Sequence, residues 1–292
     1  MKNVRIELEK FINVKGKILH FGEKKPLCAE STNTVLDILN LMIKNDMRVV
    51  ILTDKNHFQI KGIVVCGDIC GLLGGTDNCK LDIIKSDCYH QIYDTPISEI
   101  MTTAVRKVHE NVPLFIGIQI MIDQGIGTLP LIDRDGDLLG VITERDIAFL
   151  LADTNIEVKV RDIMTPNVIS CTINTTIKQA LKLVCGHGFR RLPVVDNKKL
   201  VGYFTVKDLL RYFIQDNVIQ HFKDDELDKV SNEPVTAIMS TPVITISPDA
   251  SVNEFAQILK KYNIGALPVV EAERLVGIIT ERDIMKAMAI SH

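Results

Sequence analysis

The sequence predicts an α+β fold made of four copies of one small unit, ordered strand, helix, strand, strand, helix. Three features of the sequence support this prediction. A Met-Thr or Met-Ser segment and a later Leu-Pro dipeptide recur at constant spacing, each copy carries an amphipathic helical pattern, and most copies close on an aspartate three residues after a threonine. A pattern that recurs in register along the chain indicates a repeat architecture.

The spacing is the strongest of these features. In three copies the methionine and the proline are 29 positions apart: Met101–Pro130, Met164–Pro193 and Met239–Pro268. From each proline, 15 or 16 further positions lead to an aspartate (Asp146, Asp208 and Asp283). Unrelated segments would not share this register.

A fourth, divergent copy precedes these three. Its helical segment, LCAESTNTVLDILNLM, leads into MRVVILTD and then GIVVCGDI. In this alignment Val50 stands where the others have proline, Val65 replaces the threonine, and Asp68 keeps the aspartate. We therefore expect four repeats, of which the first is altered at its closing junction.

The third copy shows the pattern of each element in the first half of the unit. A short strand is expected at Val168–Ile169. The helix that follows carries apolar residues at i, i+3, i+4 and i+7 (Ile177, Ala180, Leu181 and Val184). The other copies repeat this helical pattern at Val35, Ile38, Leu39 and Met42, at Leu114, Ile118, Met121 and Ile122, and at Val252, Phe255, Ala256 and Leu259.

The second half of the unit reads as a hairpin followed by a helix. The run Leu-Pro-Val-Val predicts a strand, Asp196–Lys199 a polar turn, and Leu200–Thr205 the next strand. A last helix is expected to begin at about Val206. A unit of about 55 residues exposes too much apolar sheet to be stable alone, so we expect the units to pair.

The intervals between copies indicate how they pair. The longer intervals hold inserts near residues 74–94 and 215–233, which favours copies one and two in one module and copies three and four in another, with a boundary near residue 155. We expect a first module at 1–155, with repeats at about 16–73 and 95–151. The second module would span 156–292, with repeats at about 160–214 and 234–288.

Composition excludes several classes of protein. Apolar residues make up 46% of the 292 residues, so global disorder is excluded. A net charge of −3 makes a nucleic-acid-binding protein unlikely. No apolar run is long enough to span a membrane, and the first ten residues do not resemble a secretory signal, so we expect a cytoplasmic protein.

The cysteines do not indicate a disulfide framework or a metal site. There are seven, an odd number. A zinc site would combine Cys66 and Cys70 with Cys79 and Cys88, but the C-x3-C spacing differs from the tighter pairs of most zinc sites. We expect free thiols, with no metal and no cofactor.

The threonine–aspartate junction has two interpretations. It could be a capping box at a helix start, or a ligand site in which the carboxylate accepts hydrogen bonds from two ribose hydroxyls while the helix N-terminus and the threonine meet a phosphate. The use of Asp in place of Glu, and the survival of Asp68 without a threonine, favour the ligand site. Basic residues lie nearby, and arginine suits phosphate oxygens. In this alignment Arg48 stands where the third copy has Arg191.

These motifs resemble the CBS (cystathionine-β-synthase) domain over about residues 20–290. The four-copy layout, with its GFRRLPVV and TERDI segments, is similar to archaeal homologues of the γ subunit of AMP-activated protein kinase. The resemblance implies four CBS-type β-α-β-β-α repeats paired into two Bateman modules. Their clefts would bind AMP, ADP or ATP, or in some members S-adenosylmethionine.

The resemblance also implies roles for individual residues. The third copy is the best match, with ribose and phosphate contacts from Thr205, Asp208, Arg190, Arg191 and Lys207. The second and fourth copies would use Thr143, Arg145 and Asp146, and Thr280, Arg282 and Asp283. They carry Gly127-Thr128 and Gly265-Ala266 where the third has two arginines, so we expect phosphate contacts from a neighbouring copy. The residues expected to flank adenine are Thr165, Pro166, Val168, Thr241, Pro242 and Ile244. The first copy, with Asp68 and Arg48, is expected to be weak or empty.

The function expected from these features is regulatory. No nucleotide-hydrolysis loop or zinc-protease motif is present, and four repeats leave no room for a catalytic domain. We expect a sensor of adenine nucleotides that signals to an unidentified partner protein and could form a homodimer. The alternatives are a sensor of S-adenosylmethionine and a nucleic-acid-binding regulator.

Overall fold

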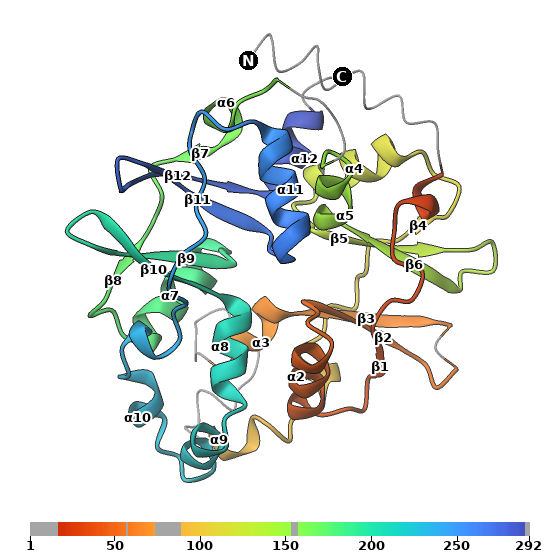
Figure 1. The fold of residues 1–292 in the computed structure, drawn as a ribbon. Coiled ribbons are helices and arrows are strands. Elements are labelled where there is room, and N and C mark those ends of the chain that lie inside the picture. The colour runs from red at the N-terminus through yellow and green to blue at the C-terminus, as the bar shows by residue number, and fades with distance from the viewer. Residues whose placement is uncertain (1–16, 57, 74–88, 153–156, 290–292) are drawn as a thin grey trace. The chain divides into compact units, whose positions relative to one another are not determined.

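The four repeats are present in the computed structural model, which describes residues 17–56, 58–73, 89–152 and 157–289. The chain is of the α+β class, as predicted, and the ribbon in Figure 1 shows the repeated combination of hairpin and helices. An N-cap residue and a C-cap glycine mark the two ends of the predicted helix of repeat 3, Ile177–His187. The hydroxyl of Thr176 accepts the Gln179 N–H, and Gly188 ends the helix with φ of 66°.

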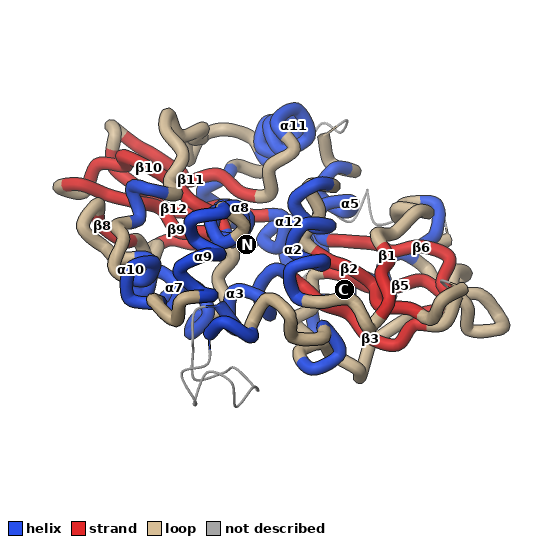
Figure 2. The backbone as a smooth tube through the Cα atoms, turned by 90° about the horizontal axis from the view of Figure 1, so that it is seen from below, coloured by secondary structure: helices blue, strands red, loops and turns tan. Residues whose placement is uncertain are grey.

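The first two repeats have the same element order. Repeat 1 contains β1 (Cys28–Glu30), α2 (Val35–Lys44), β2 (Val49–Thr53), β3 (Ile60–Val65) and α3 (Cys66–Leu73), after a 3-10 turn η1 (Ile18–His20). Repeat 2 contains β4 (Val108–His109), α4 (Leu114–Asp123), β5 (Thr128–Ile132), β6 (Leu138–Thr143) and α5 (Glu144–Phe149), after η3 (Tyr89–Gln91) and η4 (Ile97–Glu99). Figure 2 shows β1, β2 and β3 as one small sheet.

The last two repeats follow the same plan, except that an isolated bridge from Ile246 to Val269 replaces the first strand of repeat 4. Repeat 3 contains α6 (Val160–Ile163), β7 (Thr165–Pro166), β8 (Cys171–Thr172), α7 (Ile177–His187), β9 (Arg191–Asp196), β10 (Lys199–Thr205) and α8 (Val206–Phe213). The insert after it forms α9 (Asp216–Lys223) and α10 (Leu227–Ser231). Repeat 4 contains η5 (Val235–Ala237), α11 (Val252–Tyr262), β11 (Ala266–Glu271), β12 (Arg274–Thr280) and α12 (Glu281–Ala289).

Two details of the predicted register are wrong. The first strand of repeat 3 is Cys171–Thr172, paired in parallel with Val194–Val195, while Val168 and Ile169 lie outside any strand. In repeat 1 the residue opposite Ile63 is Ile51, just as Pro193 lies opposite Tyr203 in repeat 3. Ile51, and not Val50, therefore stands where the other repeats have proline. Strand pairing fixes register, and a divergent sequence does not.

The chain divides into two compact units, each with its own apolar core. Unit 1 comprises residues 1–26, 106–168 and 244–292, and unit 2 comprises residues 27–105 and 169–243. Unit 1 thus joins the bodies of repeats 2 and 4, and unit 2 joins the bodies of repeats 1 and 3. The core of unit 1 includes Leu129, Ile147 and Phe255, and that of unit 2 includes Leu52, Leu181 and Phe204. The division near residue 155 stays a prediction.

The starting segment of each repeat packs on the last strand of another repeat. Thr165 and Pro166 pair with Ile278 and Gly277 of β12, so repeat 3 contributes a strand to repeat 4. The same bridge joins Ser240 to Tyr203, Thr102 to Ile63, and Glu23 to Val141. Repeats 1 and 2 therefore exchange their starting segments, as do repeats 3 and 4.

A glycine makes this close approach possible. A Cβ placed on Gly277 would lie 2.6 Å from Sδ of Met164, and Gly62 and Gly202 meet Met101 and Met239 in the same way. The recurring methionine and glycine are therefore the two halves of one contact. No other residue type leaves room for the thioether at this distance.

The two inserts meet inside unit 2. The hydroxyl of Tyr93 donates to the carbonyl oxygen of Phe213 at 2.6 Å, and its ring packs edge-on against Phe222. His90 contacts the carboxylate of Asp225 at 3.1 Å. Part of the predicted first insert, residues 74–88, lies outside the described residues. In the described part of the chain, no helix is long and apolar enough to cross a membrane.

The glycine contact predicts the effect of one methyl group. Gly277→Ala should lower the free energy of unfolding by about 1–3 kcal/mol, because it overpacks the space that Met164 fills. Adding Met164→Ala should recover part of the loss. Urea denaturation of the wild type, Gly277→Ala and the double variant measures this.

A second glycine provides the control. Gly186 lies in α7, and a Cβ at this residue would have no atom within 4 Å, so Gly186→Ala should be neutral or stabilising by up to about 1 kcal/mol. Equal losses from both alanine substitutions would contradict the steric explanation.

Candidate functional site

The threonine–aspartate junctions have the same geometry in three repeats. Oδ2 of Asp208 accepts the N–H of Thr205 at 2.7 Å and its hydroxyl at 2.7 Å. Asp146 makes the same two contacts with Thr143, and Asp283 makes them with Thr280, all at 2.7–2.8 Å. Each aspartate thus closes the turn between the last strand and the helix that follows it.

This geometry corrects one argument made from the sequence. Oδ2 of Asp68 accepts the N–H of Val65 at 2.8 Å, although Val65 has no hydroxyl. The capping role therefore accounts for an aspartate at this position without a threonine. The retention of Asp68 does not favour a ligand over a cap.

The second oxygen of these aspartates is directed elsewhere. Oδ1 of Asp283 accepts the hydroxyl of Thr165 at 3.3 Å, and Oδ1 of Asp208 accepts Nη1 of Arg211 at 2.9 Å. In these two repeats the carboxylate therefore has one oxygen in the cap and one facing a neighbouring side chain. A carboxylate oxygen can accept more than one hydrogen bond, so a ribose hydroxyl could be bound at Oδ1.

Burial alters the acidity of two of these groups. The pKa values of Asp146 and Asp283 are raised, first because burial disfavours the ionised form. The hydrogen bonds from the paired threonine oppose the shift in both. Arg145 also opposes it at Asp146 whereas Glu23 adds to it, and Lys286 and Thr165 oppose it at Asp283.

Most of the residues expected to flank adenine lie on the exchanged segments. Thr165 and Pro166 form β7 beside Asp283, so repeat 3 contributes to the closing junction of repeat 4. Thr241 and Pro242 follow Ser240, which bridges to the last strand of repeat 3. Val168 is half-buried in unit 1. Ile244 is exposed and belongs to unit 1, not to the unit that holds Pro242.

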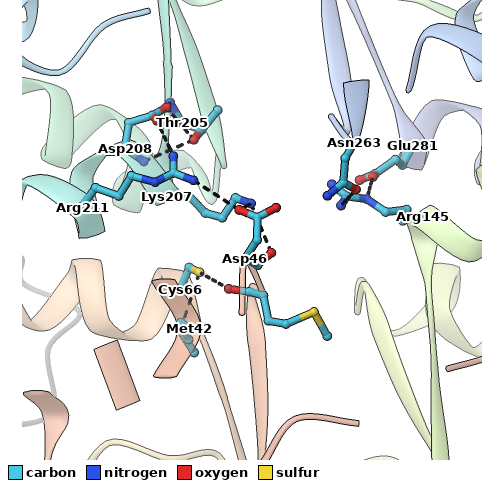
Figure 3. A network of polar contacts seen from close by, with 11 residues as sticks. Met42, Asp46, Cys66, Arg145, Thr205, Lys207, Asp208, Arg211, Asn263 and Glu281 are labelled. Atoms are coloured by element: carbon cyan, nitrogen blue, oxygen red, sulfur yellow. Dashed lines mark hydrogen bonds and ion pairs between the residues drawn. The ribbon is translucent and has the colours of Figure 1, made fainter. Parts of the chain in front are cut away.

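The predicted phosphate ligand Lys207 is held by an acidic residue of repeat 1. Its ammonium group forms an ion pair with Asp46 and donates to the Asp46 carbonyl oxygen at 3.2 Å. Figure 3 shows Asp46 contacting both Lys207 and Arg211. Burial lowers the pKa of Lys207, and Asp46 partly opposes this shift.

The predicted ligands Arg145 and Arg282 form a reciprocal pair of ion pairs in unit 1. Nε of Arg145 lies 2.9 Å from Glu281, and Nε of Arg282 lies 2.6 Å from Glu144. The two glutamate side chains are only 2% and 3% exposed. Arg145 also donates to Asn263, at the end of α11 (Figure 3). Both guanidinium groups therefore bind the paired repeat.

The remaining basic residues lie in unit 2. Arg190 is exposed directly before β9, a strand with a buried centre, and Arg191 is half-buried opposite Thr205. The Arg190 carbonyl accepts the N–H of Val206, as the Arg48 carbonyl accepts that of Cys66. Arg48 is therefore the counterpart of Arg190, not of Arg191.

The positive charges of unit 2 gather near the start of α3. Burial raises the pKa of Cys66 to about 11, and the charges of Arg48, Lys207 and Arg190 oppose this rise. Arg48 and Arg190 come from different repeats of one unit. An anion in this region would therefore be attracted from both repeats.

Unit 1 has small residues at the equivalent positions. The carbonyl oxygens of Gly127 and Gly265 accept the N–H groups of Glu144 and Glu281 at 3.1 Å. Thr128 and Ala266 pair with Thr143 and Thr280. The structure thus places these predicted site residues at the closing junctions, with no cationic side chain of their own.

Sequence reasoning missed the partners of these basic residues. Asp46 and Asn263 follow the first helix of their repeats with φ of 54° and 51°, and Glu144 and Glu281 each follow a cap threonine. Their spacing from the helix start would have shown that they are equivalent, but it could not show which repeat they contact. Among the described residues, no group of three potential ligands could hold a metal ion, and Cys79 and Cys88 lie outside them.

The family model for the CBS domain matches residues 20–75, 97–153, 160–215 and 235–290. The chain therefore belongs to the CBS-domain family and contains four CBS domains.

Two relatives match this chain over nearly its whole length. A 33.4 kDa protein encoded in a ribosomal RNA operon of Thermofilum pendens is 31% identical over 91% of this chain and 89% of its own length. Protein MJ1225 of Methanocaldococcus jannaschii is 30% identical over 91% of this chain and 96% of its own length. The crystal structure of MJ1225, described as a candidate archaeal homologue of γ-AMPK, covers 93% of this chain and 99% of its own with a TM-score of 0.86.

The ion pairs of the two units should differ in their contribution to stability. Arg145→Ala should lower the free energy of unfolding by about 3 kcal/mol, because a buried ion pair that loses one member costs roughly 3–5 kcal/mol. Lys207→Ala should cost about 1 kcal/mol or less, because its partner Asp46 is 43% exposed. Chemical denaturation of the two variants compares them, and equal losses would contradict the difference in burial.

The raised pKa of Asp283 predicts a pH dependence of stability. The native chain holds this proton more tightly than the unfolded chain, whose pKa is near 3.8, so protonation stabilises the native state. The unfolding free energy of the wild type, relative to Asp283→Asn, should therefore rise as the pH falls from 7 through the raised pKa, and level off below 3.8. A relative stability that falls with acidification would contradict the assignment.

Proposed function

We propose that this protein is a cytoplasmic, non-catalytic sensor that binds AMP, ADP or ATP in its CBS clefts and signals their occupancy to a partner protein. One observation carries the proposal. In repeat 3 the carboxylate of Asp208 closes the helix start with Oδ2 and turns Oδ1 outward, in the unit that also gathers Arg48, Arg190 and Arg191.

Each part of the ligand would meet a suitable group. The ribose hydroxyls would donate to Oδ1 of Asp208. The phosphates would lie near the start of α8, where backbone N–H groups and the helix dipole attract anions, and would bind Arg190 or Arg191. Adenine would lie against the segment Thr241-Pro242. Arginine is the candidate for the phosphate contact because its guanidinium group can bind two phosphate oxygens at once.

The clefts of repeats 3 and 4 would bind best. In both, the paired threonine and aspartate are complete and a hydroxyl residue is contributed by the exchanged segment. The cleft of repeat 1 would be weak, because Val65 removes the threonine. Since each cleft is built from two repeats, a ligand that prefers one arrangement of these repeats would shift the population toward it. That shift would be the signal to the partner.

The test separates ligand binding from helix capping. Asp208→Ala should lower stability by about 1 kcal/mol through loss of the cap. It should also weaken AMP and adenosine alike, because the ribose contact is common to both. Titration calorimetry on protein stripped of ligand, with AMP, ADP, ATP and adenosine, measures the binding.

Asp68→Ala is the matched control. It removes the same capping bond at a junction that lacks the threonine, so stability should fall while nucleotide binding is unchanged. If Asp208→Ala binds AMP normally, the aspartate is only a cap and the proposed function fails.

A further inference from the structure

The position opposite each closing aspartate can be compared across the four clefts. The bridges place Thr102, Ser240 and Thr165 at this position in the clefts of repeats 1, 3 and 4. In the cleft of repeat 2 the same position, opposite Val141, is occupied by Glu23. Three clefts thus present a hydroxyl where the fourth presents a carboxylate.

The side chain at this position reaches the aspartate. In repeat 4, Thr165 donates its hydroxyl to Asp283 at 3.3 Å. Glu23 is held at the equivalent place by two backbone hydrogen bonds to Val141, at 2.8 and 2.9 Å. Its negative charge adds to the rise in the pKa of Asp146, which places it within electrostatic reach of that carboxyl.

A second difference makes the cleft of repeat 2 more negative. Three residues after the aspartate, repeat 3 has Arg211, bonded to Asp208 at 2.9 Å, and repeat 4 has Lys286, whose charge acts on Asp283. Repeat 2 has Phe149 at this position. The basic side chain that lies three residues after the aspartate in repeats 3 and 4 is thus absent from repeat 2.

The other cations near this cleft do not replace it. Arg145 is bound to Glu281 and Asn263. Glu23 and the two lysines that follow it, Lys24 and Lys25, are all exposed, so water and salt screen all three charges. The Lys25 N–H donates to Oε1 of Glu23 at 2.8 Å, which orients this carboxylate.

We propose that Glu23 excludes phosphorylated ligands from the cleft of repeat 2, and that this cleft takes an adenosine whose 5′ group is uncharged or cationic. The inference rests on the proposed function, because it assumes that the aspartate binds ribose. Asp146 is half-buried and Glu23 is exposed beside it, and like charges repel, so a phosphate next to both carboxylates would be disfavoured. A cationic sulfonium or amine would be favoured there.

The test exchanges the residue types at Glu23 and Thr165 between the clefts of repeats 2 and 4. Glu23→Thr and the isosteric Glu23→Gln should add one AMP site per chain, or tighten the weakest site about tenfold, in calorimetric titration of the full chain. Thr165→Glu should remove one AMP site. For S-adenosylmethionine, used as the cationic probe, Glu23→Gln should weaken one site by a similar factor, while adenosine binding is unchanged.

Glu271→Thr is the control for net charge. It removes an exposed glutamate at the end of β11 remote from the junction, and it should leave all ligands unaffected. Thermal unfolding of each variant without ligand checks the fold, and Thr165→Glu tests the idea independently if Glu23 variants are unstable.

The outcomes separate this inference from the proposed function. If the wild type binds none of these ligands, the proposed function fails. If the wild type binds AMP, but neither Glu23→Gln nor Thr165→Glu alters the number or affinity of AMP sites, the proposed function stands and the role of Glu23 is refuted. A gain that is equal for AMP and adenosine would also refute it, because the effect would then be steric.

Discussion

The architecture depends on one close approach, between a glycine of the last strand and the starting segment of another repeat. Gly277 accommodates the thioether of Met164, and this contact places Thr165 beside Asp283. A side chain on the glycine would push the segment away from the last strand. Every repeat gives its starting segment and receives another, so each closing junction includes residues of two repeats.

The closing aspartate has two tasks that its two oxygens divide. Oδ2 satisfies the N–H and hydroxyl of the cap threonine, which fixes the helix start, and Oδ1 faces the exchanged segment or the next helical turn. Burial makes the ionised form costly at Asp146 and Asp283. A carboxylate kept there despite this cost suits a site where hydroxyl donors complete its hydrogen bonds. The same residue type therefore satisfies both the fold and the proposed ligand.

The two units have diverged around this shared plan. Unit 1 uses Arg145 and Arg282 for reciprocal ion pairs with buried glutamates. Unit 2 has Cys66 and Val206 in place of those glutamates, and its one lysine at the junction, Lys207, reaches Asp46. The basic residues that precede the aspartates thus hold repeats together. The arginines of unit 2 that precede the hairpin strands, Arg48 and Arg190, place positive charge near Cys66.

The sequence alone determined the number of repeats, their helices and the positions of the closing aspartates, because all three depend on local spacing and periodicity. The register of repeat 1 was predicted wrongly by one residue, because Ile51 stands where the other repeats have the proline that marks this position. Only the tertiary structure decided that Thr165 faces Asp283, that Lys207 meets Asp46 and that Glu23 lies opposite Val141. These contacts join residues more than a hundred positions apart, and no periodic pattern encodes which repeat supplies the starting segment that contacts a given last strand.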